Sequence, residues 1–107
     1  MILYGLKTCD TCRKAAKALE AAGHAVTFRD VRAEPLSGAE IATFLAAFGD
    51  RLVNRSSTTW RGLDEAGRAR PAADLLAAHP ALMKRPVLVE GEKITLGWDK
   101  AAQGLWL

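Results

Sequence analysis

The stretch 4-YGLKTCDTCRKAAKALEAAG-23 contains both cysteines of the 107-residue chain, Cys9 and Cys12, separated by two residues. A short apolar run, Met1–Tyr4, comes first, and the polar segment Gly5–Thr8 leads from it to the cysteines. An apolar run followed by a polar segment predicts a strand that ends in a loop. The cysteine pair is therefore expected just beyond the end of a first strand.

A helix is predicted directly after this loop, because small and apolar residues recur at helical spacing with basic residues on the other side. The apolar positions are Cys12, Ala15, Ala16, Leu19 and Ala22, and the basic ones are Arg13, Lys14 and Lys17. Gly23 stands where a helix stop is expected. Val26 and Phe28 then alternate with polar neighbours, which predicts a second strand through about Val31.

The middle of the chain reads as a helical insert spanning about residues 36–79. Ser37 and Glu40 form an S-x-x-E capping pattern, and an apolar helical stripe follows it as far as Gly49. Residues 50–70 are mostly polar and are expected to be irregular. Pro71 suits the first turn of a further helix that ends near His79.

The last part of the chain changes to strand-like patterning. Val87–Val89 is apolar, Gly91 and Glu92 can form a turn, and residues 93–96 alternate, which together predict a hairpin. Asp99 can cap a final short helix that runs to about Leu105. The element order is therefore β-α-β, helical insert, β-β-α.

This order predicts one α/β domain over residues 1–107, with a four-stranded mixed sheet in the order 2-1-3-4. Its first two strands are expected to be parallel and its last two antiparallel. This is the layout of a thioredoxin-like domain that carries an insertion. A C-x-x-C motif beside a βαβ pattern is a redox signature in its own right, and here it falls at the strand-to-helix junction that such chemistry requires.

Composition restricts the classes of function. Half of the residues are hydrophobic, which is enough for a single core. No run approaches the roughly 20 apolar residues that cross a bilayer, and the N-terminus lacks a signal pattern, so we expect a cytoplasmic protein without a membrane partner. The net charge is only +3 and the basic residues are scattered, so no nucleic-acid partner is expected.

The spacing of the motif assigns different roles to the two cysteines. Cys9 is expected at the N-terminus of the helix, where unpaired N–H groups and the helix dipole favour a thiolate, the form that attacks. Lys7, Arg13 and Lys14 add positive charge nearby. Cys9 is therefore the predicted nucleophile, and the more buried Cys12 is the predicted resolving cysteine for a mixed disulfide on Cys9.

Two simpler interpretations stand beside this one. A structural zinc site needs about four ligands, and the two histidines, His24 and His79, lack the spacing from the cysteines that such sites show, so we expect no metal. Cys12 alone is also consistent with a small buried hydrophobic residue. In a cytoplasmic protein a permanent disulfide between the two cysteines is not expected.

Four segments together resemble one known family: "YGLKTCDTCRKA", "AEPLS", "STTWRGLD" and "LMKRPVLVEG". In this order they are similar to the arsenate reductase (ArsC) family, and specifically to its YffB/Spx branch. The resemblance covers nearly the whole chain. It implies a thioredoxin-like fold and a thiol-dependent reductase with no bound cofactor, in which glutathione is the reductant or co-substrate.

The resemblance also implies site residues. The family's nucleophilic cysteine matches Cys9, and the arginine shortly after it matches Arg13. The arginine that holds the oxyanion in arsenate reductases matches Arg85, and the proline after it, cis in thioredoxin-like folds, matches Pro86. A basic residue of the family matches Arg55 in "RSSTTW", although Asn54 competes for that position.

The segment 94-ITLGWDK-100 separates the branches of the family. Arsenate reductases carry a further arginine there and this chain does not, so the resemblance favours a glutathione-dependent thiol/disulfide reductase. An arsenate reductase coupled to glutaredoxin is one alternative. A Spx-like redox regulator that binds RNA polymerase is another. Spx proteins have a longer C-terminal portion, whereas this sequence ends soon after its last expected helix, so the enzyme is favoured.

Overall fold

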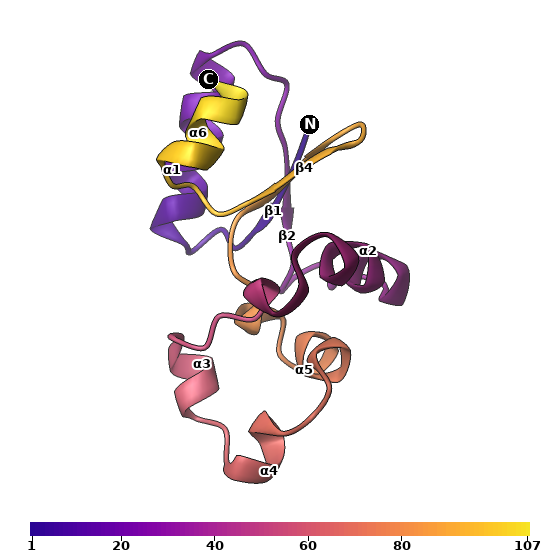
Figure 1. Cartoon of the computed structure of the whole chain (residues 1–107). Helices are drawn as coiled ribbons and strands as arrows, with labels where there is room; N and C mark the ends of the chain where they lie inside the picture. The colour runs from indigo at the N-terminus through magenta and orange to yellow at the C-terminus, as the bar shows by residue number, and fades with distance from the viewer. The chain divides into compact units, whose positions relative to one another are not determined.

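Four strands form one mixed sheet in the computed structural model, which describes residues 1–107 (Figure 1). They are β1 (Ile2–Gly5), β2 (Thr27–Asp30), β3 (Val87–Glu90) and β4 (Lys93–Leu96), in the order β2-β1-β3-β4. β1 pairs with β2 in parallel, whereas the β1–β3 and β3–β4 pairs are antiparallel. The predicted strand order and the predicted mixed sheet are confirmed.

The sheet belongs to the first of two compact units, which consists of Met1–Val31 and Arg85–Leu107. Two helices complete this unit, α1 (Asp10–Ala21) and α6 (Lys100–Trp106). Figure 1 shows the two helices side by side. Both reach the same core cluster, whose fully or nearly fully buried members are Leu3, Cys12, Ala15, Leu19, Leu88 and Trp106. Because Leu3 and Leu88 are register partners on one face of the sheet, α1 and α6 cover that face.

A buried hydrogen bond ties the last helix to the sheet. The indole Nε1–H of Trp106 donates to the hydroxyl of Thr95 on β4 at 2.8 Å. Asp99 caps α6 as predicted, because its carboxylate accepts from the backbone N–H of Ala102 at 2.9 Å. A buried indole N–H without a hydrogen-bond partner would offset part of the free energy gained by burying the ring. Here Thr95 supplies the partner.

The second unit, Arg32–Lys84, is helical. It contains α2 (Gly38–Phe48), α3 (Thr58–Arg61), α4 (Glu65–Arg68) and α5 (Ala72–Ala78), with 3₁₀ turns η1 (Gly49–Leu52) and η2 (Pro80–Leu82). Its own buried residues include Ile41, Leu52, Leu75, Leu76 and Leu82. The predicted capping box is present, since the Ser37 hydroxyl accepts from the Glu40 N–H and the Glu40 carboxylate accepts from the Ser37 N–H.

The expectation that residues 50–70 are irregular is wrong in part. The structure has the 3₁₀ turn η1 there and two one-turn helices, α3 and α4. Ser57 and Asp64 start these helices, because their side chains accept from the N–H groups of Trp60 and Gly67. An apolar period cannot be recognised over four residues, so only the capping residues could have indicated them.

The two units bear on the predicted domain organisation without testing it. The helical unit spans residues 32–84, compared with the predicted insert at about 36–79. The assignment of residues 1–107 to a single domain stays a prediction. No helix in the structure has the length and apolar character that crossing a membrane demands.

Candidate active site

Cys9 is the N-cap residue of α1. Its backbone is extended, with φ −86° and ψ 117°, and its carbonyl accepts the first helical hydrogen bond, from the Arg13 N–H at 3.1 Å. Its own N–H donates to the carbonyl of Leu6 at 3.0 Å, which closes the loop after β1. The Cys9 side chain therefore stands at the open end of the helix, as predicted, with the first-turn N–H groups beside it.

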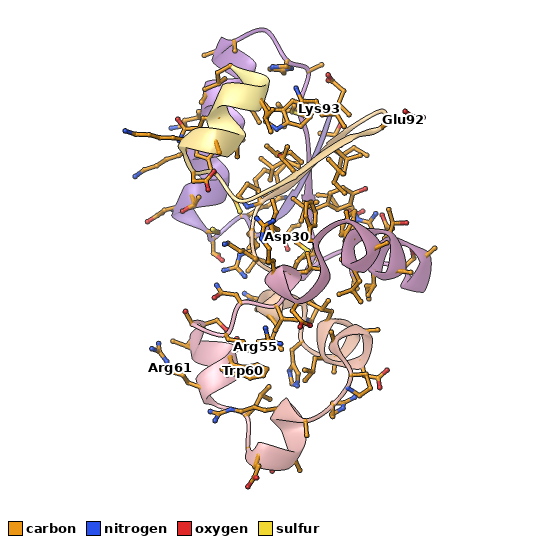
Figure 2. The ribbon with its side chains drawn as sticks, in the orientation of Figure 1. Asp30, Arg55, Trp60, Arg61, Glu92 and Lys93 are labelled. Carbon is orange, nitrogen blue, oxygen red and sulfur yellow. The ribbon has the colours of Figure 1, made fainter.

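A carboxylate from β2 anchors the same loop. The backbone N–H of Lys7 donates to Oδ2 of Asp30 at 2.9 Å, and Asp30 is the register partner of Gly5. Figure 2 shows Asp30 at the end of β2 that lies toward this loop. Sequence reasoning missed this residue. The signal was an acidic residue at the carboxyl end of a strand predicted to run parallel to β1, because such ends meet at one edge of a sheet.

The two cysteines differ in exposure as predicted. Cys9 is half-buried and Cys12 has no solvent exposure, and both are free thiols. Cys12 packs with Leu3 and Leu88 from the sheet and with Leu19 from its own helix. A reagent in solvent can therefore react with Cys9 directly. It can react with Cys12 only after the core opens, or after it has first formed a bond with Cys9.

Opposing effects act on the Cys9 thiol, and their sum lowers its pKa. Partial burial raises the pKa, because a buried thiolate loses hydration. The backbone N–H and the side chain of Cys12 hydrogen-bond to the sulfur and lower the pKa, and Arg85 lowers it further through a hydrogen bond and its positive charge. A lowered thiol pKa is what a nucleophilic cysteine needs near neutral pH.

The same neighbourhood raises the pKa of the Cys12 thiol to about 12. Burial is the main cause, and the hydrogen bond to Cys9 and its negative charge raise it further, while a backbone hydrogen bond from Leu6 and the charge of Arg85 act in the opposite direction. Cys12 therefore keeps its proton at neutral pH and donates it toward the sulfur of Cys9. When the pair loses a proton, the negative charge is therefore located on Cys9.

Arg85 enters the site from the start of β3. The Arg85–Pro86 peptide bond is cis, as the resemblance implied, and Pro86 is fully buried. The carbonyl of Pro86 accepts from the Gly97 N–H at 2.8 Å, which fixes this turn to the end of β4. The first unit thus brings Cys9, Cys12 and Arg85 together from two distant parts of the chain.

A role of Lys7 and Arg13 in binding a substrate or an anion stays a prediction. Both are exposed, and the guanidinium of Arg13 forms an ion pair with Asp10 and donates to the carbonyl of Lys7 at 3.0 Å. Its charge is therefore offset by a neighbouring carboxylate. The cation that acts on the Cys9 sulfur is Arg85.

Arg55 belongs to the helical unit, and only its surroundings within that unit are described. Its Nη1 donates to the carbonyl of Asp50 at 3.2 Å, and its guanidinium carbon lies 5.3 Å from the centre of the Trp60 ring (Figure 2). Arg68 also contacts that ring, at 5.7 Å. Cation–π contacts of this kind hold the arginine side chains in place. A role of Arg55 in anion binding stays a prediction.

The histidines weighed as zinc ligands have other surroundings. Nε2 of His24 lies 2.8 Å from the carbonyl oxygen of Trp106, and the two rings meet edge to face. His79 ends α5. No three His, Cys, Asp or Glu side chains gather in a group that could hold a metal ion. The groups that the structure brings together at the site are the thiols of Cys9 and Cys12 and the guanidinium of Arg85.

Comparison with known proteins gives a consistent result. The model of the ArsC family matches residues 4–103. A solved structure of the protein YFFB superposes with a TM-score of 0.90 at 35% identity, covering 99% of this chain and 97% of that one. An arsenate reductase (ArsC) related protein from Brucella melitensis gives a TM-score of 0.76 at 35% identity over 98% and 92% of the two chains. The global transcriptional regulator Spx of Bacillus subtilis is 29% identical over 92% of this chain and 79% of its own length.

Proposed function

This chain belongs to the ArsC family, and from that premise we propose that it is a thiol/disulfide reductase in which Cys9 is the nucleophile and glutathione is the reductant. The observation that carries the proposal is the setting of the Cys9 sulfur. Cys9 is the N-cap residue of α1, and its sulfur accepts hydrogen bonds from Cys12 and Arg85, which together lower the pKa of its thiol. These features stabilise a thiolate that solvent can reach.

The proposed reaction begins with a mixed disulfide between glutathione and a second thiol. The Cys9 thiolate attacks the glutathione sulfur, a new S–S bond forms, and the old S–S bond breaks. The second thiol leaves as a thiolate with the electron pair and takes a proton from solvent. Cys9 then carries glutathione, and the thiolate of another glutathione attacks this adduct. That step releases oxidised glutathione and regenerates the Cys9 thiolate, so one glutathione is consumed for each thiol released.

Arg85 supports both steps. Its guanidinium stabilises the thiolate before attack and the thiolate that re-forms when glutathione is displaced. Charge-assisted hydrogen bonds of this kind are roughly twice as strong as neutral ones. The planar fork of donors also suits a carboxylate or an oxyanion near Cys9.

Cys12 offers a second, slower way to resolve the adduct. Its attack on Cys9 would release glutathione and form a Cys9–Cys12 disulfide, which two further glutathione molecules reopen. Loss of the negative charge on Cys9 in the adduct removes one of the causes that raise the Cys12 pKa, but burial remains. Glutathione from solvent is therefore the main resolving thiol in this proposal.

Turnover of a small glutathione mixed disulfide, with glutathione reductase and NADPH to report oxidised glutathione, tests this mechanism. Cys9→Ser should abolish turnover, because a serine hydroxyl is too weak a nucleophile to replace a thiolate. Cys12→Ser should retain turnover that depends on the glutathione concentration. Full activity in folded Cys9→Ser would disprove the proposed mechanism.

A redox-dependent regulator is the second candidate, and the similarity to Spx over 92% of this chain favours it. In that case the Cys9–Cys12 pair would serve as a switch and RNA polymerase would be the partner. A pull-down of RNA polymerase by the reduced protein, lost after oxidation, would support the regulator over the enzyme. Retention of no polymerase subunit in either redox state would remove it.

A further inference from the structure

Gly5 is the last residue of β1, and the loop to the cysteines begins directly after it. Glycine is often needed where the backbone adopts positive φ, and this chain uses it so at Gly23, Gly49, Gly91 and Gly97. Gly5 does not have a positive φ. The conformation of the backbone therefore does not explain a glycine at position 5.

The space beside Gly5 does explain it. A Cβ atom at this position would lie 2.5 Å from Sγ of Cys12, and 3.2 Å from both Cβ of Cys12 and Cδ2 of Leu3. Carbon atoms in contact normally lie about 3.5–4.0 Å apart, so the contact with sulfur is far too short. The leucine methyl group can move a little, but the sulfur of Cys12 occupies the volume that any side chain at position 5 would need.

The Cys12 sulfur has few alternatives. It lies on α1 without solvent exposure, packed against residues of β1 and β3. Helical geometry excludes one of the three side-chain rotamers for most residues, which leaves one other rotamer or a displacement of α1 from β1. Either change moves the sulfur away from its present hydrogen bond with Cys9.

We propose that Gly5 is a positioning residue for the thiol pair. Because Gly5 has no side chain, the Cys12 sulfur can lie where its thiol donates a hydrogen bond to the Cys9 thiolate. The consequence for turnover rests on the proposed function, but the effect on Cys9 itself does not. Any side chain at position 5 weakens the donation from Cys12, and Cys9 then becomes a poorer nucleophile at neutral pH.

The test is the rate of Cys9 alkylation by iodoacetamide as a function of pH. Gly5→Ala should raise the midpoint by about one pH unit and slow alkylation at pH 7 about tenfold, because the thiolate fraction falls by that factor. Gly104→Ala is the matched control. Gly104 lies in α6, and a Cβ there meets nothing within 4 Å, so this variant should titrate like the unmodified protein.

The Gly5→Ala substitution in a Cys12→Ala variant separates an effect on the position of the Cys12 sulfur from a general disturbance of the fold. In Cys12→Ala the sulfur is absent, so adding Gly5→Ala should leave the Cys9 midpoint where Cys12→Ala alone puts it. An unchanged midpoint in folded Gly5→Ala would overturn the proposal. A shift of equal size in the Cys12→Ala background would also overturn it.

The folding of these variants is informative as well. If Gly5→Ala does not fold but Gly5→Ala/Cys12→Ala does, the sulfur is the obstacle and the proposal is supported. If neither folds, position 5 is required by the fold rather than by the sulfur, and the proposal fails. A protein in which Cys9 alkylates as expected but reduces no disulfide would refute the proposed function and leave the role of Gly5 intact.

Discussion

At the scale of single residues, the Cys9 thiolate depends on close donors and not on the general basic character of its surroundings. The N–H and side chain of Cys12 and the guanidinium of Arg85 act on the sulfur directly. Arg13 follows Cys12 in sequence, yet its guanidinium is paired with Asp10. A cation that already has a carboxylate partner contributes less to a third charge, because the two fields partly cancel.

The pH dependence of labelling follows from these contacts. The lowered pKa of Cys9 makes its thiolate predominate at a lower pH than in a free cysteine, so alkylation by iodoacetamide should reach half its maximum rate below about pH 8.5. Cys12, with a pKa of about 12, should be labelled only after unfolding. Mass spectrometry of each cysteine measures this. Equal labelling of both, with a midpoint at or above 8.5, would contradict it.

Removal of the Arg85 side chain should shift the midpoint of Cys9 alkylation to higher pH. In Arg85→Ala the Cys9 thiolate loses a charged donor, which raises the pKa of the thiol and slows alkylation at pH 7. A lost charge-assisted hydrogen bond corresponds to about 1.5–3 kcal/mol, so turnover should fall by one order of magnitude or more. Lys17→Ala, which removes an exposed cation from α1, is the control and should leave the profile unchanged. A shift of the same size in both variants would argue against a specific role for Arg85.

At the scale of elements, caps and buried anchors determine where helices start and how they attach. Ser37, Ser57, Asp64 and Asp99 each accept a backbone N–H at the start of a helix. The helix that carries the site is different, since its N-cap is Cys9, and a thiol takes the place of the hydroxyl or carboxylate oxygen. The Cys12 N–H in the first turn of α1 therefore acts on the sulfur, and the N-terminus of the helix favours a bound anion.

The anchor between α6 and β4 gives a stability prediction. Trp106→Phe removes the N–H that bonds to Thr95 and leaves a buried hydroxyl without its donor, which costs about 1–3 kcal/mol. Thr95→Val in the same background removes the unsatisfied hydroxyl and should recover part of that loss. Denaturant unfolding of the two single variants and the double variant measures the coupling between the residues. Strictly additive effects would show that the hydrogen bond contributes nothing.

At the scale of the whole molecule, membership of the ArsC family leaves the substrate open, and the end of β4 bears on it. The segment after Thr95 has no arginine, and its Gly97 adopts φ 82°, a conformation that side chains rarely take. The Gly97 N–H also bonds to the carbonyl of Pro86. The backbone conformation at position 97 therefore favours glycine over a residue with a side chain, and position 97 does not supply an additional cation.

Arsenate should accordingly be a poor substrate. With glutathione and glutaredoxin supplied, arsenate reduction by the unmodified protein should be far slower than reduction of a glutathione mixed disulfide under the same conditions. A known arsenate reductase assayed in parallel establishes that the coupled system works. Arsenate turnover as fast as disulfide turnover would place this chain with the arsenate reductases.

The order of elements, the strand order 2-1-3-4 and the different exposure of Cys9 and Cys12 could be predicted from the sequence. Each depends on periodicity and capping within a few residues, or on topological rules that leave few arrangements for that order. The two short helices between residues 58 and 68 could not be predicted from periodicity, because one turn is too short to show it. Their capping residues were the only local sign.

The sequence by itself thus determined the fold class, the location of Cys9 at a helix N-terminus and the burial of Cys12. Only the tertiary structure decided that Arg85, rather than Lys7 or Arg13, acts on the Cys9 sulfur, and that Asp30 and Gly5 lie at the site, because strand pairing brings these residues together. Local sequence sets which face of a helix is apolar. The distances between side chains on separate strands, and hence the charge on a sulfur or the room beside it, exist only once the sheet has formed.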